Sequence, residues 1–384
     1  MTPSPVLEAM RRQASAIYAT GAVPDAIVIQ RQVLLAARSA GAETPDDSLF
    51  LGLMLHATGQ LDDGVCLLRD GIARFPAHAA LHENLGVFLL GQNDVAAAIE
   101  ACQTALKLGS ASPNVLDCLA DAFNRLGQTE AAIAAGQDAL QAKDRRFGAR
   151  APLAMVPDRP PPPFNPLNPA ENVIAYSLWG EAPRYRVPLL ENARILAHLF
   201  PGWTMRVYHD AAVDDAYLDA LAGLGVDLVP MTLPPSVPSH RRLLWRFGVI
   251  AEPTVRRFLI RDADSLLSVK ERVAVDAWLA SRFHFHAMRD WFTHTDLLLA
   301  GMWGGVGGIL PAPEALFRAY TGWRVENDHL DQDLLAETVW PIVRRDVLIH
   351  DSVFTGCLGS VAFPPYGALP PGTHIGQNAF SQFV

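Results

Sequence analysis

Two aspartates separated by one residue, Asp262 and Asp264, are the side chains best placed to hold a divalent cation. They follow a short apolar run, 258–260, which predicts a buried strand. Two carboxylates at the end of such a strand can lie near one hard cation, and Mg²⁺ and Mn²⁺ prefer oxygen ligands. That cation would act as a Lewis acid on a leaving diphosphate, as a nucleotide-sugar requires. The alternative is a solvated turn, or a helix cap at Asp264.

Arginines lie close to this pair in the sequence. Arg241, Arg242 and Arg246 fall in a stretch with helical spacing, 241–250, and the last two are four residues apart on one face. Guanidinium groups match phosphate oxygens, so we expect Arg242, Arg246 or Arg261 to contact a bound diphosphate. Ion pairs with surface carboxylates are the alternative.

Three more aspartates are candidates for the reacting centre. Asp331 and Asp333 lie in a segment predicted to begin a helix. One of them could take the acceptor proton as a general base, or stabilise positive charge that develops on a sugar ring. Helix capping is the alternative for Asp331. Asp290 follows a predicted strand at 283–286. We expect Asp290 and His294 to line the side of the site where the molecule that accepts the sugar would bind.

A histidine and a glycine-rich run complete the expected site. His374 is a candidate third metal ligand, because neutral imidazole suits Mn²⁺ in a mixed site; a surface histidine is the alternative. Five glycines fall within 301–308, around Trp303. Glycines allow a ligand to approach the backbone closely, and an indole ring can pack on a sugar ring. We therefore expect Trp303 and Gly304 to contact the nucleotide-sugar that donates the sugar. The alternative is a tight turn with a core tryptophan.

Strands and helices alternate over the region that carries these residues. Apolar runs predict strands at 172–178, 205–208, 226–229 and 257–260, and helical spacing predicts helices at 187–199, 214–224 and 241–250. This order predicts a Rossmann-like α/β domain with a mostly parallel sheet and right-handed crossovers. Ligands of such sheets bind at the carboxyl ends of the strands. We therefore expect Asp262, Asp264 and also Ser177, near the end of the first strand, to meet a donor there.

The first 150 residues contain a repeat with a period of 34 residues. The matching positions are Leu51-Gly52, Leu85-Gly86 and Leu119-Ala120; Gly64, Ala98 and Ala132; Gly71, Ala105 and Ala139; and the turn residues Gly59, Asn93 and Gly127. This pattern resembles the tetratricopeptide repeat, and a degenerate copy precedes it at 16–38. The resemblance implies a curved stack of helices that binds peptides or partner proteins; a support or dimerisation module is the alternative.

A proline-rich stretch separates the two regions. Residues 156–169 read VPDRPPPPFNPLNP, which forbids a helix and favours an extended, semi-rigid segment. The fold expected is α plus α/β: helical repeats over 1–150, a linker over 151–169 and an α/β domain over 170–384. Because the repeats add no catalytic group, a fragment that starts near Pro169 is expected to bind the donor by itself.

Composition narrows the class of protein. The formal net charge of -9 argues against broad nucleic-acid binding, which needs a basic face. No stretch approaches the ~20 apolar residues of a membrane span, and the first residues lack the apolar core of a secretory leader. The four cysteines, Cys66, Cys102, Cys118 and Cys357, form no CxxC pair and are interpreted as small buried thiols, with a disulfide or zinc role as the alternative. We expect a cytoplasmic protein.

The region 170–384 resembles glycosyltransferases of the GT-A type. The stretches that carry the resemblance are LLWRF at 243–247, FLIRDADS at 258–265, HAMRDWFTH at 286–294 and AGMWGGVGG at 300–308, which occur together in bacterial glycosyltransferase-like domains attached to other modules. A looser similarity is to the glycogenin-like retaining transferases, through Asp331-Gln332-Asp333 and His374-Ile375-Gly376. That pattern then has a lysine near position 379, where this chain has alanine. We expect Arg246 or Arg261 to replace its diphosphate contact.

The resemblance implies a glycosyltransferase that uses a nucleotide-diphospho-sugar with Mn²⁺ or Mg²⁺, and a protein, peptide or glycan acceptor delivered by the repeats. One alternative is an inactive transferase-like domain on an interaction scaffold, against which the intact Asp262, Asp264 and Asp333 speak. Another is a metal-dependent nucleotidyltransferase or phosphohydrolase. The chain lacks the GxxxxGK(S/T) phosphate loop that many such enzymes carry.

Overall fold

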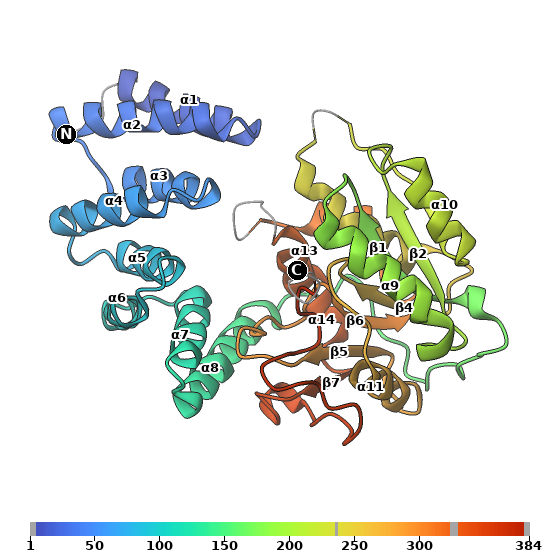
Figure 1. Cartoon of the computed structure of the whole chain (residues 1–384). Helices are drawn as coiled ribbons and strands as arrows, with labels where there is room; N and C mark the ends of the chain where they lie inside the picture. Colours follow the sequence, from blue (N-terminus) through green and yellow to red (C-terminus); the bar gives the residue numbers. More distant parts are fainter. Residues whose placement is uncertain (1–4, 235–236, 323–328, 380–384) are drawn as a thin grey trace. The chain divides into compact units, whose positions relative to one another are not determined.

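The structure is a computed structural model that describes residues 5–234, 237–322 and 329–379. The chain divides into two compact units, Met1–Ala139 and Leu140–Val384. Over the described residues the first unit consists of helices joined by short turns, and the second holds all the strands (Figure 1). The expected combination of a helical repeat region with an α/β domain is therefore confirmed.

The first unit is a stack of tetratricopeptide-like helix pairs. Its helices are α1 (Pro5–Ala19), α2 (Val23–Ser39), α3 (Pro45–Ala57), α4 (Leu61–Arg74), α5 (Ala79–Gly91), α6 (Val95–Lys107), α7 (Pro113–Arg125) and the first part of α8 (Thr129–Phe147). The predicted turn residues Gly59, Asn93 and Gly127 have φ angles of 69°, 64° and 69°, which glycine and asparagine tolerate. A side chain on Gly64 would overlap the ring of Phe88, so the small residues do allow close helix packing.

The cysteines are free thiols, three of them buried as expected. Cys66 is the exception, because it lies on the exposed side of α4. None of the helices in the described residues is both long and apolar enough to cross a membrane.

The second unit is built around a seven-stranded sheet in the order β3-β2-β1-β4-β6-β5-β7. The strands are β1 (Asn172–Leu178), β2 (Thr204–His209), β3 (Asp227–Pro230), β4 (Arg257–Arg261), β5 (Phe285–Arg289), β6 (Met302–Val306) and β7 (Val347–Asp351). Neighbouring strands are parallel except that β6 is antiparallel to β4 and β5. The mostly parallel sheet is confirmed, and β5 begins two residues later than the sequence predicts.

Helices cover both faces of this sheet, which explains why its central strands are apolar throughout. Val173 and Ala175 of β1 belong to a core with η2, whereas Ile174 and Tyr176 belong to a core with α9 and α11. The helical elements are α9 (Pro183–Leu199), α10 (Asp215–Gly223), α11 (Val269–Leu279), α12 (Pro313–Ala319), α13 (Leu330–Leu334), α14 (Trp340–Val343), the 3₁₀ segments η1 (Pro169–Glu171), η2 (Ser239–Ala251) and η4 (Cys357–Gly359), and the π-helix η3 (Leu335–Val339). Figure 1 shows α9 lying across the strands.

The segment η2 departs from the expected α-helix at 241–250. It is a 3₁₀ helix, and the amide of Arg246 donates to the hydroxyl of Ser177 at 3.0 Å. A hydroxyl at the end of β1 thus takes a backbone donor that an α-helix would use internally. The two elements that carry Ser177 and Arg246 are fixed to each other by this bond.

The boundary between the units differs from the predicted one. Residues 140–150 belong to the second unit, where Phe147 is fully buried in the sheet core. The Lys143 ammonium donates to the carbonyl of Thr295 at 3.0 Å, and the Trp340 indole donates to Asp144 at 2.8 Å. The helical pattern of α8 runs through position 139 without a break, so the sequence contains no sign that its last turns pack on another core.

The proline-rich stretch has no helix before η1, as predicted, but it is packed against the second unit. Phe164 stacks on Trp203 with ring centroids 5.5 Å apart. The side-chain amide of Asn172 donates to the carbonyl of Asn165 at 2.9 Å, and Arg257 donates to the carbonyl of Pro162. Residues 162–168 are thus part of the α/β fold.

Candidate functional site

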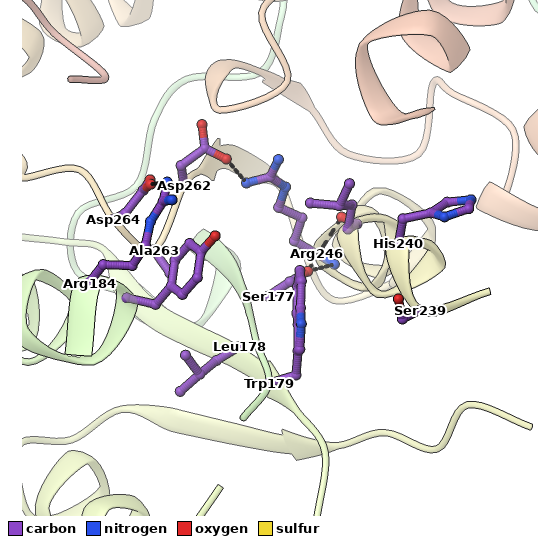
Figure 2. A pocket seen from close by; sticks show the side chains of 12 residues that line it. Ser177, Leu178, Trp179, Arg184, Ser239, His240, Arg246, Asp262, Ala263 and Asp264 are labelled. Atoms are coloured by element: carbon purple, nitrogen blue, oxygen red, sulfur yellow. Dashed lines mark hydrogen bonds and ion pairs between the residues drawn. The ribbon is translucent and has the colours of Figure 1, made fainter. Parts of the chain in front are cut away.

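A cavity of about 460 Å³ opens at the carboxyl ends of β1 and β4 (Figure 2). The chain runs from β1 outward through β2 and β3, then returns to the other side of β1 as β4. This reversal is the topological switch point at which open α/β sheets bind ligands. The cavity is lined by the last two residues of β1 and the residue that follows (177–179), the start of α9, η2 up to Arg246 and residues 262–264 after β4. The expected position of Ser177, Asp262 and Asp264 at one edge is therefore what the structure shows.

Arg246 lines the cavity and connects it to two groups behind its wall. Its guanidinium pairs with Asp262, donates to Asp331 at 2.7 Å and donates to the carbonyl of Arg261 at 2.8 Å (Figure 2 shows the pair with Asp262). Burial lowers the pKa of Arg246, but the two carboxylates outweigh that effect and raise it. A permanently charged, rigid guanidinium therefore holds Asp262 in place.

Asp264 has a different cationic partner. Its carboxylate accepts a hydrogen bond from Arg184 at 2.7 Å, and Arg184 lies at the start of α9 (Figure 2). Burial raises the pKa of Asp264, and Arg184 opposes that rise. Each aspartate of the Asp-x-Asp pair thus faces an arginine. Asp262 faces the buried Arg246, and Asp264 faces the half-exposed Arg184.

A glycine makes room for Asp262. A side chain on Gly301 would overlap the carboxylate of Asp262, whereas φ at Gly301 is not in the left-handed region. Alanine is therefore excluded by Asp262 and not by the backbone. Of the glycines predicted to approach a ligand, Gly301 is the one that touches this pair.

Gly301→Ala should disturb the site with little effect on the fold. The new methyl group would push Asp262 away from Arg246, and losing one charge-assisted hydrogen bond corresponds to at least about a tenfold loss in binding of a ligand that needs this geometry. Gly223→Ala is the matched control, because a side chain there meets open space. Nucleoside diphosphate binding by calorimetry is the measurement. Equal affinities in the two variants would show that the Asp262 position is unimportant.

An aromatic wall borders the cavity, and none of its residues was expected from the sequence. Trp179 lies 6.4 Å from Tyr185 and 6.4 Å from Trp245, measured between ring centroids. Trp179 and Tyr185 line the cavity. Ser239 and His240 line it too, and Figure 2 labels both of them and Trp179. The available signal was the position of Trp179 directly after the first strand, at the edge where ligands bind.

The structure separates the two aspartates of α13. One carboxylate oxygen of Asp331 accepts from Arg246 at 2.7 Å, and the other accepts the amide of Gln332 at 2.9 Å. Burial raises the pKa of Asp331, and Arg246 opposes the rise. Asp333 is also buried, and its carboxylate does not share Arg246. Neither aspartate lines the cavity, but Asp331 is connected to Asp262 through Arg246.

His374 and Asp290 lie together, in a neighbouring cluster. The His374 ring stacks on Trp291 at 5.1 Å and meets His294 edge-on at 4.8 Å. Asp290 pairs with Lys270 and accepts the amide of Ile375 at 2.9 Å. Within the described residues, no three His, Cys, Asp or Glu side chains are grouped closely enough to hold a metal ion. The expected trio of Asp262, Asp264 and His374 is not assembled in this structure.

Residues 374–379 still approach the Asp-x-Asp pair. Asp290 holds one end of this segment through Ile375, and the amide of Ala379 donates to the carbonyl of Asp264 at 2.8 Å at the other. Asp290 thus positions a segment that borders the site. Its contacts with Ile375 and Lys270 fix this segment to the α/β domain.

Two of the expected arginines do not line the cavity. Arg242 lies 3.3 Å from Asp210, which follows β2. Arg261 forms a buried ion pair with Glu271 of α11 and donates to the carbonyl of Trp303 at 3.0 Å. The side chain of Arg261 points to the α11 face of the sheet because residues alternate along β4.

Trp303 and Gly304 are part of the sheet core. Trp303 is 1% exposed and packs edge-on against Phe247 at 5.8 Å and Phe258 at 5.3 Å. A side chain on Gly304 would overlap the backbone of Phe258, so this glycine serves the contact between β6 and β4. Neither residue lines the cavity.

Comparison with known proteins gives distant similarities. No family model matches the chain, and no curated protein matches it. Among solved structures, a variant of the O-GlcNAc transferase from Thermobaculum terrenum aligns at 22% identity and a TM-score of 0.41, over 60% of this chain and 42% of that one. A MamA fragment from Desulfovibrio magneticus aligns at 19% identity and a TM-score of 0.33, over 36% of this chain and 77% of that one. The chain thus spans about two fifths of the transferase.

Proposed function

We propose that the second unit is a GT-A-like glycosyltransferase domain that transfers a sugar from a nucleotide-diphospho-sugar. The observation that carries this proposal is the cavity at the β1–β4 switch point, which combines an aromatic wall, two carboxylates and two arginines. Each part of a nucleotide-sugar has a chemical match there: an aromatic face for the base, a carboxylate for the ribose hydroxyls and guanidinium groups for the diphosphate.

The donor base is assigned to the side of Trp179 and Tyr185, because these rings line the cavity. Asp262 lines the same cavity (Figure 2), and we assign it to the ribose hydroxyls or to a metal ion. Arg184 and Arg246 are the cationic groups of the cavity. Arg246 was among the arginines expected from the sequence, whereas Arg184 was not.

The aspartate pair fits a Mg²⁺ or Mn²⁺ ion bound together with the donor. Both carboxylates line one cavity, and both are paired with cations, so this part of the cavity already favours positive charge. Mg²⁺ is commonly held by one or two carboxylates plus substrate phosphates, which requires no third protein ligand. When bound, such an ion would neutralise the leaving diphosphate. Asp264 and Asp262 would hold it.

We assign the carboxylate beside the reacting sugar to Asp331. It shares Arg246 with Asp262, so it is tied directly to the donor cavity. In an inverting reaction Asp331 would accept the proton of the acceptor hydroxyl; in a retaining one it would stabilise positive charge on the sugar ring. Asp333 remains the second candidate for this role. We further propose that the acceptor is a protein, peptide or glycan that the helical stack brings to this domain.

Nucleotide-sugars tested with and without Mn²⁺ decide between the proposed function and its alternatives. We expect at least one donor to raise the melting temperature in Mn²⁺ but not in EDTA, and to be hydrolysed slowly, because water can replace an acceptor. Stabilisation without any hydrolysis or transfer would favour the inactive scaffold. A panel in which no nucleotide-sugar stabilises the protein in Mn²⁺ would contradict the proposal.

A further inference from the structure

The two arginines of the cavity hold the aspartate pair in different ways. Arg246 is 3% exposed and its guanidinium bonds to Asp262, to Asp331 and to a backbone carbonyl. The side chain of Arg184 is 50% exposed; it pairs with Asp264, and its guanidinium carbon lies 4.8 Å from the centre of the Tyr185 ring. A buried, multiply bonded guanidinium has one position, whereas an exposed ion pair contributes little stability and is easily exchanged.

Arg184 also lies in an unfavourable place for a cation. It is the second residue of α9, whose first turn holds no acidic residue and whose start has no side-chain cap. The N-terminal end of a helix carries partial positive charge, which favours anions and disfavours a nearby guanidinium. In the absence of ligand, the charge of Asp264 offsets this. An anion in the same cavity would gain from the helix end and from the guanidinium together.

We propose that Arg184 is a displaceable counter-ion: it pairs with Asp264 until a divalent cation takes that carboxylate, and then turns to the diphosphate of the donor. This inference rests on the proposed function, since it needs both ligands. Arg184 and Asp264 line the same cavity, so both side chains border the space that the donor would occupy. A guanidinium can form the same paired hydrogen bonds with the oxygens of a diphosphate as with a carboxylate.

The test is Arg184→Ala, measured with two probes that should respond in opposite directions. Binding of Mn²⁺ alone, followed by water-proton relaxation, should become tighter by about two- to fivefold, because a competing cation is removed. Binding of a nucleoside diphosphate in saturating Mn²⁺, chosen from UDP, GDP and ADP by its affinity for the wild type, should weaken by at least about tenfold. Arg184→Lys should restore part of both effects, since it keeps the charge.

Arg186→Ala is the matched control. Arg186 is two residues along the same helix, and it pairs with Asp214 instead of with the cavity. It should leave both affinities within about twofold of the wild type. A purely structural role for Arg184 would instead weaken both ligands and lower the melting temperature.

The outcomes separate this inference from the proposed function. If the wild type binds Mn²⁺ and a nucleoside diphosphate, but Arg184→Ala weakens both or changes neither, the counter-ion exchange is wrong and the function stands. If the wild type binds no nucleoside diphosphate in Mn²⁺, the proposed function fails, and the exchange fails with it.

Discussion

Asp264→Asn is expected to lower sugar transfer by a factor of at least about 100, while the protein stays folded. The substitution keeps the size of the side chain and removes the charge that a divalent cation needs. The ion pair that it breaks involves a half-exposed arginine, so the free energy of unfolding should change by less than about 1 kcal/mol. Initial rates of transfer and of donor hydrolysis, with thermal unfolding on the same sample, are the measurements.

Asp214→Asn is the control for this prediction. Asp214 also pairs with an arginine of α9, but it caps α10, where its carboxylate accepts the amide of Tyr217 at 2.8 Å. Asparagine caps helices about as well as aspartate, so this variant should keep its activity and stability. Full transfer by Asp264→Asn, or full activity of the wild type in EDTA, would remove the metal from the mechanism.

A fragment that starts at Pro169 was expected from the sequence to bind the donor by itself, but the structure changes this expectation. We now expect that fragment not to fold stably, in contrast to one that starts at Thr129. The shorter fragment lacks Phe147, which is fully buried in the sheet core, and Lys143, whose ammonium pairs with Asp296 at 2.6 Å. Loss of one buried phenylalanine side chain alone costs about 3–5 kcal/mol, a large part of the stability of a typical domain. Urea unfolding of the two fragments, followed by circular dichroism, measures the difference.

The longer fragment also tests what the helical stack contributes. If the stack delivers the acceptor, the fragment from Thr129 should hydrolyse the donor in water at a rate near that of the full chain and lose most of its transfer to a macromolecular acceptor. Equal losses in the two rates would mean that the stack supports the protein in another way. Cooperative unfolding of the Pro169 fragment at the same urea concentration as the longer one would show that residues 140–150 do not stabilise the sheet core.

The sequence predicted those parts of the site that depend on local pattern. The apolar run before Asp262 predicted a strand, and the strand's end predicted the edge at which the pair lies. The apolar run could not show towards which face of the sheet the side chain of Arg261 points. In the structure it points to Glu271 of α11 and not to the cavity. The glycines around Trp303 suggested that its ring packs on a sugar. In the structure these glycines allow strands to pack closely, as Gly304 does against the backbone of Phe258.

Contacts between distant segments explain the remaining differences. Asp331 is connected to the cavity residue Asp262 because both pair with Arg246, and the two aspartates are 69 positions apart, a relation that no local spacing reveals. His374 was chosen for its neighbouring residues in the sequence, whereas its ring packs on Trp291. The end of the repeat region was placed at 150 by period, although the last turns of α8 pack on the sheet core.

The shared guanidinium of Arg246 has a consequence for the order in which ligands can enter. Asp262, Asp264 and Asp331 carry three formal negative charges, and Arg184 and Arg246 carry two positive ones, so this group has a net charge of about -1 at neutral pH. A diphosphate that approaches this group without a cation is repelled by its net negative charge, because both arginines are already paired with carboxylates. One divalent cation reverses the sign to about +1. We therefore expect the cation to bind before the nucleotide or together with it, and to leave last.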